Sequence, residues 1–75
     1  MKIKYDPIVD ALDIRIIEGN YECEVLHISD QVNIDIGPKG KIVAVEILDA
    51  SKMIPDLKTE GIEIENLLMK NQAVA

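Results

Sequence analysis

The stretch that decides the fold of this chain is Lys41-Ile-Val-Ala-Val-Glu-Ile-Leu-Asp-Ala-Ser51. Successive side chains of a strand point to opposite faces, so a strand that is apolar at both parities must be covered on both faces. The aliphatic residues of this stretch occupy both parities: Val43, Val45 and Ile47 in one set, and Ile42, Ala44 and Leu48 in the other. We therefore place this strand in the centre of a sheet, with other structure packed over it.

Four further strands are predicted before residue 41. Apolar and polar residues alternate over Lys2–Tyr5, Ala11–Ile17 and Val32–Ile36, which is typical of half-buried strands. Residues 21–28 form another strand, but its apolar residues change parity along the way. A one-residue slip of this kind predicts a β-bulge near Val25–His27.

Short turns join these predicted strands. Glu18-Gly19-Asn20 and Gly37-Pro38-Lys39-Gly40 contain the residues that tight turns require. Parallel neighbours would need crossovers of a dozen or more residues, so connections this short predict antiparallel pairing. We expect a five-stranded antiparallel meander.

The C-terminal third predicts one or two short helices. Asp49 is a good N-cap for a helix that Pro55 limits to a turn or two. Residues 62–70 favour a helix by propensity, although Ile62-Glu63-Ile64-Glu65 also fits a strand. The fold class is therefore α+β. The most buried residues are expected to be Ile14, Ile16, Val32, Ile34, Val43, Val45 and Ile47.

Seventy-five residues form one domain, residues 1–75, and a domain of this size is marginally stable without help. The single cysteine, Cys23, excludes an internal disulfide, and one Cys with one His offers no zinc-ligand spacing. No cofactor is implied. Oligomerisation, most simply as a homodimer, is the remaining source of stability.

The charge balance limits the partners. A net charge of −6 with a single arginine, Arg15, argues against direct nucleic-acid binding and suits a small basic protein. The N-terminus lacks the apolar core of a signal peptide, and no apolar run is long enough for a membrane span. We expect a cytoplasmic protein that does not enter a membrane and has a reduced thiol.

Four segments together are similar to a known family. They are residues 2–7 (Lys-Ile-Lys-Tyr-Asp-Pro), 10–15 (Asp-Ala-Leu-Asp-Ile-Arg), 31–36 (Gln-Val-Asn-Ile-Asp-Ile) and 45–51 (Val-Glu-Ile-Leu-Asp-Ala-Ser). The chain resembles the domain of unknown function 2283 family of small prokaryotic proteins over about residues 1–52, which leaves a C-terminal helix or tail over 53–75. The resemblance implies a small α+β domain and no established enzyme activity. Some members look like partners of small toxin-like proteins encoded beside them.

Two groups of residues are candidates for chemistry. Asp6, Asp10 and Asp13 could gather around Mg²⁺ or Ca²⁺, with His27 as a further ligand, but their spacing does not match a calcium-binding loop. We interpret the aspartates as turn and surface residues and predict no metal site.

His27 with Ser29 and Asp30 supplies the ingredients of nucleophilic catalysis, yet neighbours on one strand end point in different directions. A partner-facing histidine that could tune an interface is the simpler interpretation. Cys23 lies between Glu22 and Glu24, which disfavour a reactive thiolate, so a small buried residue is expected. The sequence therefore predicts no catalytic residue.

The leading hypothesis is a non-enzymatic interaction module that self-associates and binds a small basic or toxin-like protein. Exposed aliphatic side chains are expected to form the interface, namely Leu67, Leu68, Ile42 and Leu48. Two alternatives remain open: a metal-dependent hydrolase that uses the aspartate cluster, and a carrier of a small ligand, which would need an apolar pocket of a few hundred Å³.

Overall fold

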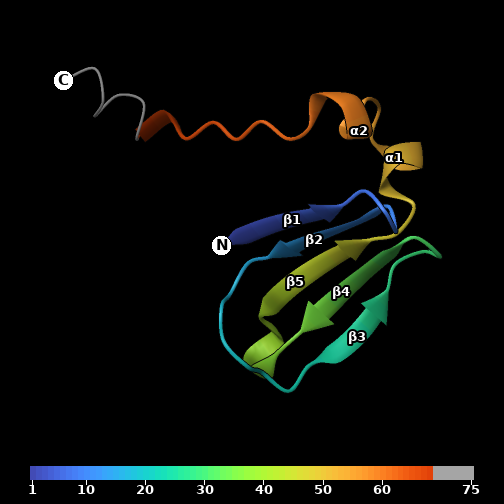
Figure 1. Cartoon of the computed structure of the whole chain (residues 1–75). Coiled ribbons are helices and arrows are strands. Elements are labelled where there is room, and N and C mark those ends of the chain that lie inside the picture. The colour runs from blue at the N-terminus through green and yellow to red at the C-terminus, as the bar shows by residue number, and fades with distance from the viewer. Residues whose placement is uncertain (69–75) are drawn as a thin grey trace.

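The computed structural model describes residues 1–68, which form one open sheet followed by two short helices (Figure 1). This arrangement confirms the α+β class and the five antiparallel strands. The elements in chain order are β1 (Lys2–Asp6), β2 (Ala11–Arg15), β3 (Glu24–His27), β4 (Val32–Ile36), a 3₁₀ turn (Pro38–Gly40), β5 (Ile42–Ile47), α1 (Ala50–Met53) and α2 (Leu57–Glu60).

The strand order is β1-β2-β5-β4-β3, so β5 is central as predicted, but the sheet is not a simple meander. β5 lies between β2 and β4, and β3 forms an outer edge (Figure 1). The turn at Glu18-Gly19-Asn20 is therefore not a hairpin, because residues 16–23 cross the end of the sheet to reach β3. The Ile16 and Ile17 N–H groups donate to the Val43 carbonyl at 2.8 and 3.2 Å, which holds the start of this connection against β5.

The register separates an apolar face from a polar face, since residues paired directly across strands lie on the same side of a sheet. One row of the apolar face runs across all five strands through Ile3, Ile14, Val45, Ile34 and Leu26. The equivalent row of the polar face runs through Lys4, Asp13, Glu46, Asn33 and His27.

The core lies where α1 and α2 pack on the apolar face. Leu12, Ala50 and Leu57 are its buried residues. The partly buried residues around them are Ile3, Tyr5, Ile14, Ile47 and Ile54. All the strand residues of this cluster belong to β1, β2 and β5, so the two helices cover the half of the face that these strands form.

This partial cover explains why the predicted core was mostly wrong. Of the seven residues expected to be most buried, Val43 alone is fully buried, at 3% exposure. Ile16 is 41% exposed because β2 ends at Arg15, before it. The other five are half-buried. Ala44 is also buried at 3%, so β5 is covered at both parities, as its sequence predicts.

The bulge lies elsewhere than predicted. β3 spans Glu24–His27 in continuous register with β4, and the register shift falls between β4 and β5. Asp35 pairs with Ala44 and Ile36 pairs with Ile42, which leaves Val43 as the extra residue. The change of parity in residues 21–28 instead reflects a strand that starts later than predicted.

The C-terminal segment also differs from its prediction. Residues 61–66 have no regular secondary structure, so the helix predicted over residues 62–70 is absent over 62–66. Gly61, at φ 73°, ends α2, and a segment of so few residues lacks the length that stabilises a helix. Helical geometry begins only at Leu67, and Met69 and Lys70 lie outside the described residues.

Candidate functional site

Asp10 ties the turn between β1 and β2 to the start of α1. It has a left-handed backbone (φ 55°), and its carboxylate accepts hydrogen bonds from the Tyr5 hydroxyl at 2.5 Å and the Ser51 hydroxyl at 2.6 Å. The Ser51 N–H donates to the same carboxylate at 3.0 Å, and the Ala50 N–H donates to the Asp10 carbonyl at 2.9 Å. The node formed by Tyr5, Asp10 and Ser51 therefore fixes the angle at which the chain leaves the sheet.

The electrostatics of this node match a structural role. Hydrogen bonds from Ser51 and then Tyr5 lower the pKa of Asp10 below its usual 3.8. Burial, and then the hydrogen bond to Asp10, raises the pKa of Tyr5 to about 12. The proton therefore stays on Tyr5 and the charge on Asp10. A carboxylate stabilised in this way is a poor general base, so the node is suited to holding structure rather than to activating Ser51.

The other residues considered for a metal site do not meet at Asp10. The Asp6 carboxylate accepts the Ile8 N–H at 3.0 Å inside the turn. Asp13 lies on the polar face of β2, paired with Lys4 and Glu46, and His27 lies two strands beyond β5 on edge strand β3. Within residues 1–68, no group of three or more His, Cys, Asp or Glu side chains is placed to hold a metal ion.

His27, Ser29 and Asp30 do not form a catalytic group either. The His27 Nδ1 lies 2.5 Å from the Asn33 Oδ1 on the polar face. The Ser29 hydroxyl instead accepts the N–H groups of Gln31 and Val32 at 3.2 and 3.1 Å, which makes it a turn residue. Half-buried Cys23 donates to the Tyr21 carbonyl at 3.4 Å.

The polar face carries two carboxylates in direct opposition. Asp13 of β2 and Glu46 of β5 are register partners, and like charges placed directly opposite destabilise a sheet. The Asn33 amide donates to Glu46 at 3.4 Å from the other side. Lys4 pairs with Asp13 from the β1 side, whereas the register partners of Glu46 are Asp13 and Asn33, so Glu46 has no cationic partner in the row.

Replacing Glu46 with glutamine should raise the free energy of unfolding by about 0.2–1 kcal/mol, because it removes the repulsion with Asp13. Glutamine keeps the length of the side chain and an oxygen for Asn33. The gain should shrink in 1 M NaCl, where exposed charges are screened. Urea unfolding at low and high salt measures both effects. A Glu46→Gln protein that is less stable than the unmodified protein at low salt would show that the pair is not repulsive.

The apolar face is uncovered on the β3–β4 side. Leu26 and Ile28, on and just after β3, are 47% and 56% exposed. The C-terminal segment adds more exposed aliphatic surface and runs away from α2 without lying on the sheet (Figure 1). Its side chains Ile62, Ile64, Leu67 and Leu68 are 43%, 65%, 65% and 68% exposed.

The four residues predicted for an interface are all exposed and come from separate parts of the chain. Leu67 and Leu68 belong to the C-terminal segment. Ile42, at 45% exposure, starts β5 and pairs with Ile36, whereas Leu48, at 38%, follows the opposite end of the strand. Leu26 and Ile28 continue the apolar face beyond the helices, and Ile42 lies on the same face because it pairs with Ile36.

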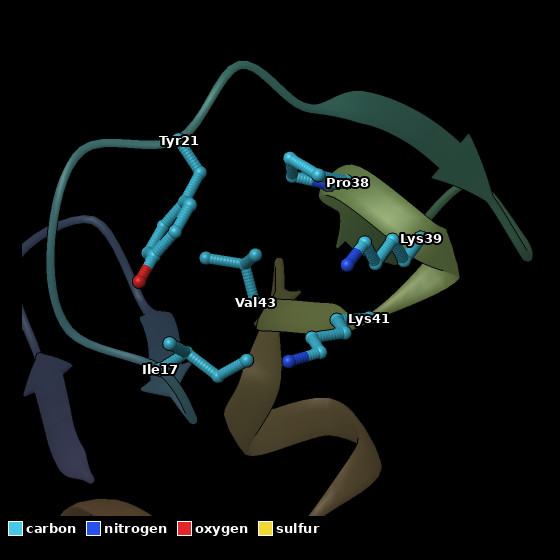
Figure 2. Close-up of a pocket in the computed structure, with 6 residues that line it drawn as sticks. All are labelled: Ile17, Tyr21, Pro38, Lys39, Lys41 and Val43. Carbon is cyan, nitrogen blue, oxygen red and sulfur yellow. The ribbon is translucent and has the colours of Figure 1, made fainter.

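The connection between β2 and β3 encloses a hollow against the turn that precedes β5 (Figure 2). The hollow has a volume of about 240 Å³. Its lining residues are Ile17, Tyr21, Pro38, Lys39, Lys41 and Val43. Sequence reasoning missed it because a simple meander would not bring residues 17 and 21 beside the start of β5. The node of Tyr5, Asp10 and Ser51 was missed for a similar reason, since its members are up to 46 positions apart.

Among residues 1–68, no helix is long and apolar enough to cross a membrane.

An open antiparallel sheet with a partial helical layer, a structural carboxylate node and an uncovered apolar half defines a small α+β domain. The chain belongs to the family described as protein of unknown function DUF2283, whose family model matches residues 2–51. The matched region contains all five strands and ends at Ser51, the residue that completes the node with Asp10. No curated protein and no solved structure matches the chain.

Proposed function

We propose that this protein is a non-enzymatic, cytoplasmic interaction module that forms a homodimer and binds a small basic, toxin-like protein. The observation that carries self-association is the uncovered half of the apolar face. Leu26 and Ile28 continue the rows that α1 and α2 cover over β1, β2 and β5, and they are about half exposed. Contiguous apolar patches of several hundred Å² mark interaction sites.

The exposed aliphatic side chains support a dimer. Leu26 and Ile28 of the sheet, and Ile62, Ile64, Leu67 and Leu68 of the C-terminal segment, are 43–68% exposed. Burial of these side chains between two copies would stabilise the dimer.

The expected mass in solution at micromolar concentration is twice the 8.3 kDa chain mass, measured by light scattering or sedimentation. Leu26→Glu should return it to the monomer value, because burying leucine contributes about 1.5–3 kcal/mol and a buried unpaired charge costs more. Leu68→Glu should do the same if the C-terminal segment forms the contact, and should leave the dimer intact if two sheets pack face to face.

Ile8→Glu is the matched control for these variants. Ile8 is 92% exposed in the turn between β1 and β2, away from the uncovered face, so its replacement should leave the mass unchanged. A mass of 8.3 kDa for the unmodified protein would contradict the dimer.

Two features favour a basic partner. The net charge is −6, and the opposed carboxylates of Asp13 and Glu46 lie at the centre of a polar face that a cationic side chain could approach. A lysine or arginine of the partner beside Glu46, which has no cationic register partner, would add attraction, which gives specificity and a faster encounter. Co-purification with the product of the neighbouring gene is the direct test of this partner.

A further inference from the structure

We propose that the hollow beside the β2–β3 connection binds a small monocarboxylate with an apolar body, such as a single-ring aromatic acid or a short-chain fatty acid. This site lies at the start of β5 near the Pro38–Gly40 turn, and it does not depend on self-association. Its volume, about 240 Å³, is slightly below the usual 300–1,000 Å³ of small-molecule sites, so its ligand must be small.

The floor and one wall of the hollow are apolar. Val43, which is 3% exposed, and half-buried Ile17 form the floor, and the ring of Tyr21 faces them from the connection (Figure 2). Gly19 leaves room for this ring, because a Cβ at that position would lie 3.2 Å from the Tyr21 ring. An aromatic wall opposite an aliphatic floor suits a flat ring or a short acyl chain.

Two ammonium groups define the polar end. The side chains of Lys39 and Lys41 extend over the hollow, and their Nζ atoms point into the space framed by Ile17, Val43 and Pro38 (Figure 2). Within residues 1–68, neither ammonium group has a hydrogen bond or an ion pair. Lys39 has a left-handed backbone (φ 61°, ψ 25°), an uncommon conformation for a residue other than glycine. Small-molecule sites combine apolar walls with a few placed polar groups, and two ammonium groups in that position attract a carboxylate.

The surrounding charge selects a monoanion. Glu22 and Glu24 line a neighbouring, more open hollow that shares Pro38 with this one. Their carboxylates oppose a ligand that carries several negative charges, such as a phosphate ester, more strongly than a ligand that carries one. The two lysines can neutralise a single carboxylate fully. A neutral ligand would leave both ammonium groups without a partner.

The experiment is a titration of the ¹⁵N-labelled protein with benzoate, hexanoate and neutral benzamide, followed in amide NMR spectra at low salt. Benzoate and hexanoate should produce saturable shifts at Tyr21 and Val43, and benzamide should bind about tenfold more weakly. The double variant Lys39→Gln, Lys41→Gln should weaken benzoate binding about tenfold, as expected for the loss of two exposed ion pairs. Both lysines are exposed, so their replacement leaves the core intact.

The double variant Lys52→Gln, Lys58→Gln is the control for net charge, because it removes two positive charges from α1 and α2, outside the lining of the hollow. It should leave the benzoate affinity unchanged. Equal binding of benzoate and benzamide, no saturable shift at Tyr21 or Val43, or equal losses in the two double variants would each overturn the proposal. None of these readouts depends on the oligomeric mass, so the carboxylate site and the dimer can fail separately.

Discussion

Replacing Leu12 with alanine should lower the free energy of unfolding by about 2–5 kcal/mol, through lost apolar burial and the cavity that remains. Leu12 is 4% exposed and forms the core with Ala50 and Leu57. A domain of this length has roughly 4–11 kcal/mol of total stability, so one leucine can account for much of it. Urea unfolding of the variant at a fixed protein concentration measures the loss.

Ile8→Ala is the control for this prediction. The Ile8 side chain is 92% exposed, and its truncation should change stability by no more than about 0.5 kcal/mol. Fixed concentration matters because dimerisation stabilises the folded state by mass action. If Leu12→Ala unfolded at the same urea concentration as Ile8→Ala, the packing of α1 and α2 on β2 would be wrong.

The part of the fold that sequence reasoning predicted is the part that depends on local pattern. The parity of the apolar residues in residues 41–51 was enough to place β5 in the centre, and burial of both Val43 and Ala44 agrees with it. Alternation located β1, β2 and β4. A short helix does begin after Asp49 and end before Pro55, but Asp49 makes no side-chain capping hydrogen bond at the start of α1. These patterns involve residues that are close together in the sequence, so they can be recognised without knowing the fold.

The errors concern choices between partners that are distant in sequence. A strand such as β2 can pair with the next strand in the sequence or with any later one. The short predicted turns favoured pairing with the next strand. β5 pairs with β2 instead, and residues 16–23 become a crossing connection. Ile16 then leaves the core, and the hollow at Tyr21 appears. The node of Asp10 and Ser51 depends on the same long-range choice, so Asp10 resembled a turn residue like Asp6.

Replacing Asp10 with asparagine should destabilise the protein at neutral pH more than Ser51→Ala does, because asparagine removes the charge on which the hydrogen bonds from both Tyr5 and Ser51 act. Ser51→Ala removes one hydroxyl donor and keeps the N–H of residue 51 on the carboxylate. The melting temperatures of the two variants at pH 7 show which replacement destabilises the protein more. A Ser51→Ala protein that melts below the Asp10→Asn protein would show that the hydroxyl, rather than the charge, holds α1 to the turn.

The pH dependence separates this node from ordinary packing. The folded pKa of Asp10 lies below its unfolded value, near 3.8, so its contribution is present above pH 3.8 and is lost as the pH falls through the folded pKa. The difference in melting temperature between the unmodified protein and Asp10→Asn should therefore become smaller as the pH falls below 3.8. Tyr5 behaves in the opposite sense: its contribution to the stability of the fold is present below pH 10.0 and is lost as the pH rises toward about 12.

The pKa of Tyr5 can be measured by ultraviolet titration in a Tyr21→Phe background, where Tyr5 is the remaining tyrosine. This pKa should fall in Asp10→Asn, because the hydrogen bond and charge of Asp10 raise it. It should stay above 10.0, since burial is the larger cause and remains in the variant. A pKa of Tyr5 that is the same with and without the Asp10 charge would remove the basis for the node.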